Sequence, residues 1–187
     1  MKKSYIFALA VILGPAFAWA QEGRTLKGVT LPVQVAREGK VLALNGMGLR
    51  TRIVFKVYVG GLYVEKPSKD AAALIASEQN KLMELVFLRN VDGGTVAGAI
   101  SEGFEKNSKE QLPALKERVE KFRKLIPDLK KGDKLSFFYE PARGLSVESN
   151  GKASGQIEGK DFADALFRCW LGGIPADKDL KKGLLGE

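Results

Sequence analysis

The sequence predicts one α+β domain in which a large, mostly antiparallel sheet is covered by a layer of helices. Its segments read in the order strands, helices, strands, helices, which is typical of this class. Asn150-Gly151 between two apolar runs indicates a tight hairpin and hence antiparallel neighbours. The chain has 187 residues, 45% of them hydrophobic and 28% charged, which suits one domain with its own core.

The first 20 residues have the pattern of an export signal. Lys2 and Lys3 precede an apolar stretch over residues 5–17, and Ala18-Trp19-Ala20 supplies the small residues that signal peptidase requires before Gln21. The stretch is too short to span a bilayer comfortably. We therefore expect a cleaved Sec signal over residues 1–20, a folded domain over residues 21–187, and a periplasmic location.

The first half of the domain is rich in strand patterns. Residues 29–36 alternate apolar and polar side chains, as in a half-buried strand, and Pro32 favours an edge position. A turn over residues 37–40 leads into a second strand. We expect these two segments to pair.

Glycines punctuate the next segments. Gly46 and Gly48 interrupt the second strand, which indicates a β-bulge or the close approach of another segment. Residues 51–65 then predict a further strand that bends at Gly60 and Gly61.

The middle of the chain combines helices with one central strand. A short helix is predicted over residues 69–77 with Ser68 as its N-cap. The almost continuous apolar run in residues 80–91 indicates a central strand. Asp92 caps the next helix, and another helix follows over residues 110–126.

The last third returns to strands and ends in helices. We expect a strand over residues 135–139 and a hairpin over residues 145–157. Asp161 is the predicted cap of an apolar helix that Gly172 ends, and a short helix follows Pro175.

The residues that the chain lacks exclude several kinds of chemistry. It has no histidine and a single cysteine, Cys169, so Ser-His-Asp and Cys-His triads, histidine or paired-cysteine zinc sites and an intrachain disulfide are all excluded. We expect no metal and no cofactor, and we interpret Cys169 as a small buried hydrophobe.

The charge is positive but evenly distributed. The formal net charge is +8, and it becomes +6 when the signal with its two lysines is removed. Acidic and basic residues alternate over residues 109–124, as on a solvated helix face, so no nucleic-acid partner is expected. A diffuse attraction to acidic ligands or phospholipid headgroups remains, and we expect a monomer.

Four segments together have a recognisable pattern: Leu44-Asn45-Gly46-Met47-Gly48-Leu49-Arg50, residues 55–64, residues 89–104 and residues 161–172. They resemble the chalcone isomerase superfamily, and in particular its exported bacterial members. The resemblance implies an open-faced β-sandwich, a large antiparallel sheet backed by helices with a ligand cleft between them.

The resemblance also implies two uses of one arginine. Plant members cyclise a chalcone to a flavanone without a cofactor, and the arginine stabilises the developing enolate. Related non-catalytic members bind fatty acids through this arginine and a tyrosine. Arg50 and Tyr58 match these two positions, whereas Val96 and Gly103 stand where the isomerases have a catalytic tyrosine and an asparagine.

The candidate ligand-binding residues are Arg50, Tyr58 and Thr95, with Arg52 as the substitute for Arg50 if the strand register differs. A guanidinium offers a planar fork for a carboxylate or an enolate oxygen. Alternatively, Arg50 pairs with a carboxylate across the sheet or faces water, Tyr58 is an ordinary strand aromatic, and Thr95 only caps a helix. In a regular strand, Lys56 would share the face of Tyr58.

Three functions remain open. The leading hypothesis is a non-catalytic periplasmic binder of a fatty acid or similar apolar carboxylate, in which no residue is catalytic. The alternative is a cofactor-independent lyase or isomerase in which Arg50 stabilises an enolate. The third is an envelope interaction protein whose own side chains fill the cleft. Four aromatic residues are expected to form plain core, and the alternative is that they line an apolar tunnel: Phe87, Phe104, Phe167 and Trp170.

Overall fold

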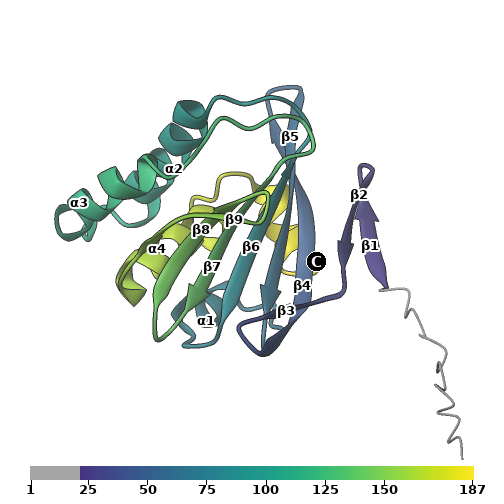
Figure 1. Cartoon of the computed structure of the whole chain (residues 1–187), viewed down its shortest axis with the longest axis horizontal. Coiled ribbons are helices and arrows are strands. Elements are labelled where there is room, and N and C mark those ends of the chain that lie inside the picture. Colours follow the sequence, from purple (N-terminus) through teal and green to yellow (C-terminus); the bar gives the residue numbers. More distant parts are fainter. Residues whose placement is uncertain (1–21) are drawn as a thin grey trace, which may run out of the picture.

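A seven-stranded antiparallel sheet forms the centre of the computed structural model, which describes residues 22–187 (Figure 1). Each strand pairs with the next one along the chain, so the sheet is a meander and the predicted antiparallel sheet is confirmed. The strands are β3 (Gln34–Arg37), β4 (Lys40–Arg52), β5 (Phe55–Val64), β6 (Lys81–Phe87), β7 (Lys134–Glu140), β8 (Gly144–Ser149) and β9 (Lys152–Ile157). The predicted signal segment, residues 1–20, lies outside the described residues.

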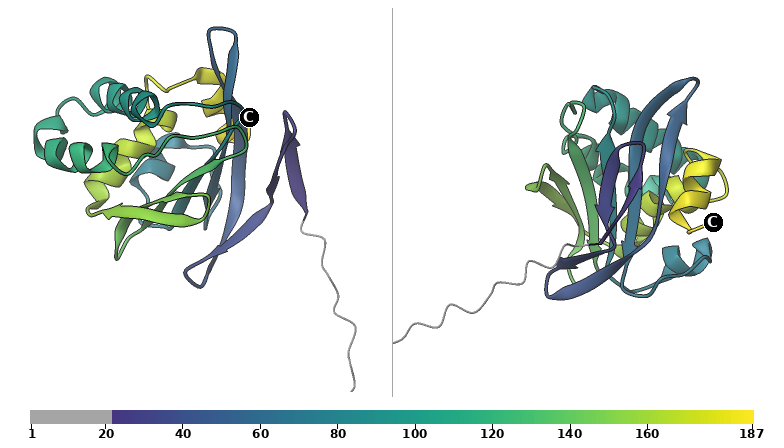
Figure 2. Two further views of the ribbon diagram at one scale, coloured as in Figure 1. Left: turned by 45° about the horizontal axis from the view of Figure 1, so that its top comes forward. Right: turned by 90° about the vertical axis from the view of Figure 1, so that its right-hand side faces the viewer.

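Helices cover one face of this sheet (Figures 1 and 2). They are α1 (Ala71–Ala76), α2 (Gly93–Asn107), α3 (Leu112–Arg123), α4 (Lys160–Leu171) and α5 (Lys178–Leu184). α4 lies against both α2 and the sheet, and eight of its twelve residues are buried. Within residues 22–187, no helix has the length and hydropathy needed to cross a membrane.

The helix caps agree only partly with the sequence patterns. Asp92 caps α2 as predicted, since its side chain accepts a hydrogen bond from Thr95 N. The N-cap of α1 is Asp70 and not Ser68, because helical geometry begins two residues later than the pattern suggested. α4 begins after Gly159, and Asp161 lies in its first turn, where it forms an ion pair with Arg118.

The opposite face of the sheet carries a separate hairpin, β1 (Gly23–Leu26) and β2 (Val29–Pro32). The prediction of one strand over residues 29–36 is therefore wrong, because the chain breaks at Val33 and resumes as the edge strand β3. Leu31 anchors the hairpin on the sheet, where it occupies the space that a side chain on Gly61 would need. The hairpin thus gives the second face an apolar cover.

β4 and β5 form one long hairpin whose turn is Ile53-Val54. The predicted strand over residues 51–65 is wrong at this point, because Ile-Val carries none of the usual turn residues. The predicted bend at Gly60 and Gly61 is also wrong, since both glycines lie within β5. They admit close neighbours: a Cβ on Gly60 would lie 3.3 Å from Leu180 Cδ1.

Two bulges shape this hairpin. The register shifts once at Asn45 in β4 and once at Val57 in β5. The backbone of α5 approaches β4 so closely that a Cβ on Gly48 would lie 2.7 Å from Leu180 O, and a Cβ on Gly46 would lie still closer to Gly183 O. The prediction for these two glycines is confirmed, because both a bulge and a close approach are present.

Candidate functional site

A cavity of about 350 Å³ lies between the β4–β5 hairpin and the helices α2 and α4. Its inner wall is apolar and includes Phe87 from β6, Val96 and Ile100 from α2, and Trp170 from α4. Its rim carries arginine, asparagine and threonine side chains. The volume is within the range of small-molecule sites, which combine apolar walls with a few polar groups.

Arg50 and Tyr58 are direct partners across the β4–β5 ladder, and both line the cavity. Opposite residues in an antiparallel pair project from the same face of the sheet, so the guanidinium of Arg50 and the phenol of Tyr58 both face this cavity. The bulge at Val57 changes the alternation of β5, so Phe55, Val57 and Tyr58 all line the cavity. The expectation that Lys56 shares the face of Tyr58 is therefore wrong.

The hydroxyl of Tyr58 is held by Trp170. Trp170 Nε1 donates a hydrogen bond of 2.9 Å to Tyr58 Oη, and both residues are buried. Burial raises the pKa of Tyr58 to about 12, although the hydrogen bond from Trp170 and the charge of Arg50 act to lower it. The phenol is thus protonated near neutral pH, and its O–H is not used by Trp170. It can donate to a ligand oxygen.

Three guanidinium groups, those of Arg50, Arg52 and Arg89, line the same cavity. None of them takes part in the ion pairs found within residues 22–187. The guanidinium of Arg89 lies 4.6 Å from the ring centre of Phe55, a cation–π contact. Sequence reasoning missed Arg89 and Phe55 as site residues, because the bulge and the turn that place Phe55 have no clear sequence pattern.

Thr95 also lies at the cavity, on the first turn of α2. Its backbone N–H donates to Asp92 Oδ1 at 2.9 Å. The cap is therefore the Asp92 carboxylate, which accepts this hydrogen bond, and Thr95 is the donor and lies exposed at the rim. Asn90, another rim residue, accepts a 2.9 Å hydrogen bond from Lys131 N and so ties the rim to the loop before β7.

The two positions where the isomerases have polar catalytic groups are apolar here for different reasons. Val96 lines the cavity with an aliphatic side chain. Gly103 lies where α2 meets α4, and a Cβ there would come within 2.6 Å of Cys169 Sγ. An asparagine at this position would therefore collide with α4 before it reached the cavity.

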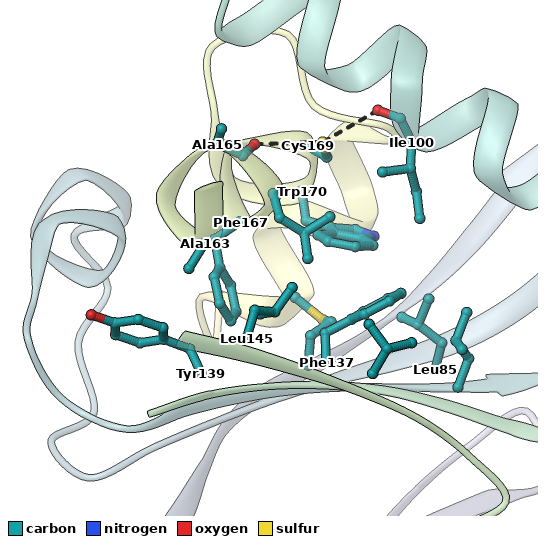
Figure 3. Close-up of a cluster of buried hydrophobic side chains, with 14 of the residues drawn as sticks. Leu85, Ile100, Phe137, Tyr139, Leu145, Ala163, Ala165, Phe167, Cys169 and Trp170 are labelled. Carbon is teal, nitrogen blue, oxygen red and sulfur yellow. Dashed lines mark hydrogen bonds between the residues drawn. The ribbon is translucent and has the colours of Figure 1, made fainter. Parts of the chain in front are cut away.

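Cys169 is the contact point of these two helices. It is 2% exposed, and its Sγ lies 3.6 Å from both Ile100 O and Ala165 O (Figure 3). Burial raises the pKa of the thiol strongly, so it behaves as the small hydrophobe expected from the sequence.

The four aromatic residues expected to form plain core or to line an apolar tunnel are divided between these two roles. Phe87 and Trp170 line the cavity, whereas Phe104 and Phe167 are buried core. Trp170 projects from α4 toward the sheet, above Phe137, whose ring centre is 5.6 Å away (Figure 3). No group of three or more potential metal-ligating side chains occurs in the described part of the chain.

The chain belongs to the chalcone isomerase-like family. The sequence model of that family matches residues 23–186, which is almost the whole described domain. A search of curated proteins found no match.

A solved relative shares this architecture at low sequence identity. The chain is similar to the crystal structure of a fatty-acid binding protein from Arabidopsis thaliana, with a TM-score of 0.70 and 14% identity. The match covers 88% of this chain and 96% of the plant chain. At this identity the similarity establishes the fold, the open-faced sandwich expected above.

Proposed function

We propose that this chain is a non-catalytic binding protein for a fatty acid or a similar apolar carboxylate. The observation that carries the proposal is a cavity in which an apolar interior meets the buried phenol of Tyr58 and the guanidinium of Arg50, which forms no ion pair with the residues that the structure describes. The third hypothesis, a cleft filled by the chain's own side chains, predicts no such cavity beside Arg50.

In the proposed complex, Arg50 binds the carboxylate through two parallel N–H donors and Tyr58 donates its O–H to the same group. The acyl chain lies along Phe87, Ile100 and Trp170, and Thr95 contacts the ligand at the rim. Charged hydrogen bonds contribute about 1.5–3 kcal/mol, and each buried methylene about 0.8 kcal/mol. After the cost of association these contributions are compatible with micromolar affinity.

The plant relative supports this choice, since its printed description is that of a fatty-acid binding protein. The residues of the cavity support it independently. Val96 and Gly103 supply neither a hydroxyl nor an amide to order a reacting substrate. The arrangement therefore favours binding over chemistry.

Trp170 provides the test. It is the only tryptophan after Trp19, and it lines the cavity. Titration of the domain with fatty acids should change its fluorescence saturably, and the matching fatty alcohols should bind more weakly because they lack the carboxylate. Arg50→Gln should weaken binding of the acid by about 10–150-fold, the equivalent of about 1.5–3 kcal/mol.

The matched control is Arg24→Gln, which removes an exposed arginine from β1 outside the cavity. It should bind like the wild type. Arg52→Gln tests whether the other rim arginine holds the carboxylate instead. Equal affinity for acid and alcohol, or no fluorescence change with any chain length, would exclude the proposal.

The second candidate function is a cofactor-independent lyase or isomerase that uses Arg50 and Tyr58. Arg50 beside a phenol whose pKa is raised to about 12 is also an arrangement that can stabilise an enolate oxygen. Loss of chalcone absorbance on incubation with the protein would support this candidate. Turnover that survives Arg50→Ala would remove its mechanism.

We further propose, from the N-terminal pattern alone, that the protein is exported and resides in the periplasm. Cell fractionation followed by intact mass measurement tests this. The expected species begins at Gln21, and an uncleaved chain in the cytoplasmic fraction would contradict the proposal.

A further inference from the structure

The β4–β5 hairpin ends in an apolar tip formed by Ile53, Val54 and Phe55. These side chains are 88%, 77% and 55% exposed, so three consecutive large hydrophobic residues face solvent. The hairpin projects beyond the neighbouring strands and helices in both views of Figure 2. Single exposed hydrophobic residues are common, whereas a contiguous apolar projection indicates an interaction site.

The turn keeps this apolar character at a conformational cost. Ile53 has φ +58°, in the left-handed region that β-branched residues rarely adopt. The other two-residue hairpin turns of the described chain each include a glycine with positive φ, namely Gly28, Gly39 and Gly151. Strain that a glycine would relieve is typically retained at functional positions.

Cationic side chains surround the tip. Arg52 precedes it, Lys56 follows it, and Arg89 lies against the ring of Phe55. Among the ion pairs of residues 22–187 none includes these three groups. Two acids lie nearby, and both accept hydrogen bonds from backbone N–H groups: Asp92, which also lines the cavity, caps α2, and Asp177 accepts from Thr51 N at 3.0 Å. An apolar tip flanked by the cationic side chains of Arg52, Lys56 and Arg89 is complementary to an anionic lipid surface.

The same residues form the mouth of the cavity. Arg52, Ile53 and Phe55 all line it. If the tip enters a bilayer, the mouth therefore lies at the level of the headgroups. A convex projection of three side chains offers a protein partner little surface, since specific interfaces need far more buried area.

We propose that the β4–β5 tip inserts into the surface of anionic phospholipid bilayers, with Ile53, Val54 and Phe55 among the acyl chains and the surrounding cations on the phosphates. This docking function goes beyond the proposed ligand binding. It requires no free fatty acid, so the two proposals can fail separately.

The first test is co-sedimentation of the domain with vesicles of phosphatidylcholine alone or mixed with phosphatidylglycerol. Wild-type protein should bind the mixed vesicles and bind phosphatidylcholine much less. The double variant Ile53→Gly with Val54→Ser should reduce the partition coefficient at least about tenfold, because it removes the apolar tip. It introduces Gly-Ser at a turn whose first residue has positive φ, so the hairpin should form at least as well.

Matched variants separate the tip from general surface effects. Val41→Ser removes a 61% exposed side chain at the opposite end of β4 and should bind like the wild type. Lys56→Gln should weaken binding about fivefold. Lys152→Gln, at the far edge of the sheet, should change binding less than Lys56→Gln.

Insertion is measured with an environment-sensitive fluorophore. Because Cys169 is buried, a label on Val54→Cys reacts at that position alone in the folded protein. Its emission should increase and shift to the blue with mixed vesicles, and a label on Val41→Cys should not respond. Equal binding to both vesicle types, an unaffected Gly-Ser variant or a silent label at position 54 would overturn the proposal. A wild-type dimer in sedimentation that the Gly-Ser variant abolishes would overturn it in favour of self-association through the tip.

Discussion

Removal of the Tyr58 hydroxyl should destabilise the domain through Trp170. In Tyr58→Phe the ring and its contact with Phe87, at 5.5 Å between centres, are retained, and only the hydrogen bond from Trp170 Nε1 is lost. The indole is 2% exposed, so its N–H loses a partner in a buried site. Such a loss costs about 1–3 kcal/mol.

This loss in the free energy of unfolding should lower the melting temperature of Tyr58→Phe. For a domain of this size, each kcal/mol shifts the midpoint by about 2–4 °C, so a central cost of about 2 kcal/mol predicts a decrease of about 4–8 °C. The assay is reversible thermal or urea unfolding followed by the fluorescence of Trp170. The same signal should also report the changed surroundings of the indole in the folded variant.

Tyr63→Phe is the matched control, on the same strand. Tyr63 is fully buried on the opposite face of β5, and its hydroxyl has no hydrogen-bond partner among the described residues. Loss of an unpaired buried hydroxyl should leave the free energy of unfolding unchanged or raise it by about 1 kcal/mol. If both variants lose the same stability, the Trp170–Tyr58 hydrogen bond is not the cause and the reasoning is refuted.

Three further predictions concern other parts of the fold. Gly48→Ala should cost about 1–3 kcal/mol in urea unfolding, because its Cβ would lie 2.7 Å from Leu180 O on α5, and an unchanged midpoint would contradict that contact. Cys169 should not react with a thiol reagent in the folded protein and should react at once in denaturant; reaction under native conditions would show that the buried thiol is reached. Burial lowers the pKa of Lys81 to about 8. The folded state then releases this proton before the unfolded chain does, so the free energy of unfolding should rise with pH between about 8 and 9, until the raised pKa of Cys169 acts in the opposite direction. Lys81→Met should remove this rise, and a rise that persists in the variant would assign it to another group.

Much of the fold could be predicted from local patterns. The Asn150-Gly151 hairpin, the central strand β6 and the Asp92 cap each depend on residues close together in the chain, and all three are present. Residues Gly46 and Gly48 also indicated a bulge or a close approach correctly. These features were predictable because turn residues, caps and apolar periodicity act over a few positions.

The errors in the first hairpins concern features that apolar alternation does not mark. The break at Val33 separates β3 from the β1–β2 hairpin, whose Leu31 lies against the distant Gly61 on the back of the sheet. The turn at Ile53-Val54 contains two β-branched residues that normally favour a continuous strand. Neither feature is visible in a local pattern, because Leu31 packs against a distant residue and the exposed Ile53-Val54 turn follows from the pairing of β4 with β5.

The sequence by itself determined the class of the domain, the absence of histidine chemistry and the candidate pair Arg50 and Tyr58. Only the tertiary structure decided that these two residues are cross-strand partners facing one cavity, and that Phe55 and not Lys56 joins them. The physical reason is the bulge at Val57. One extra residue in β5 reverses which side chains face the helices, and the register in which β4 pairs with β5 determines where that residue lies.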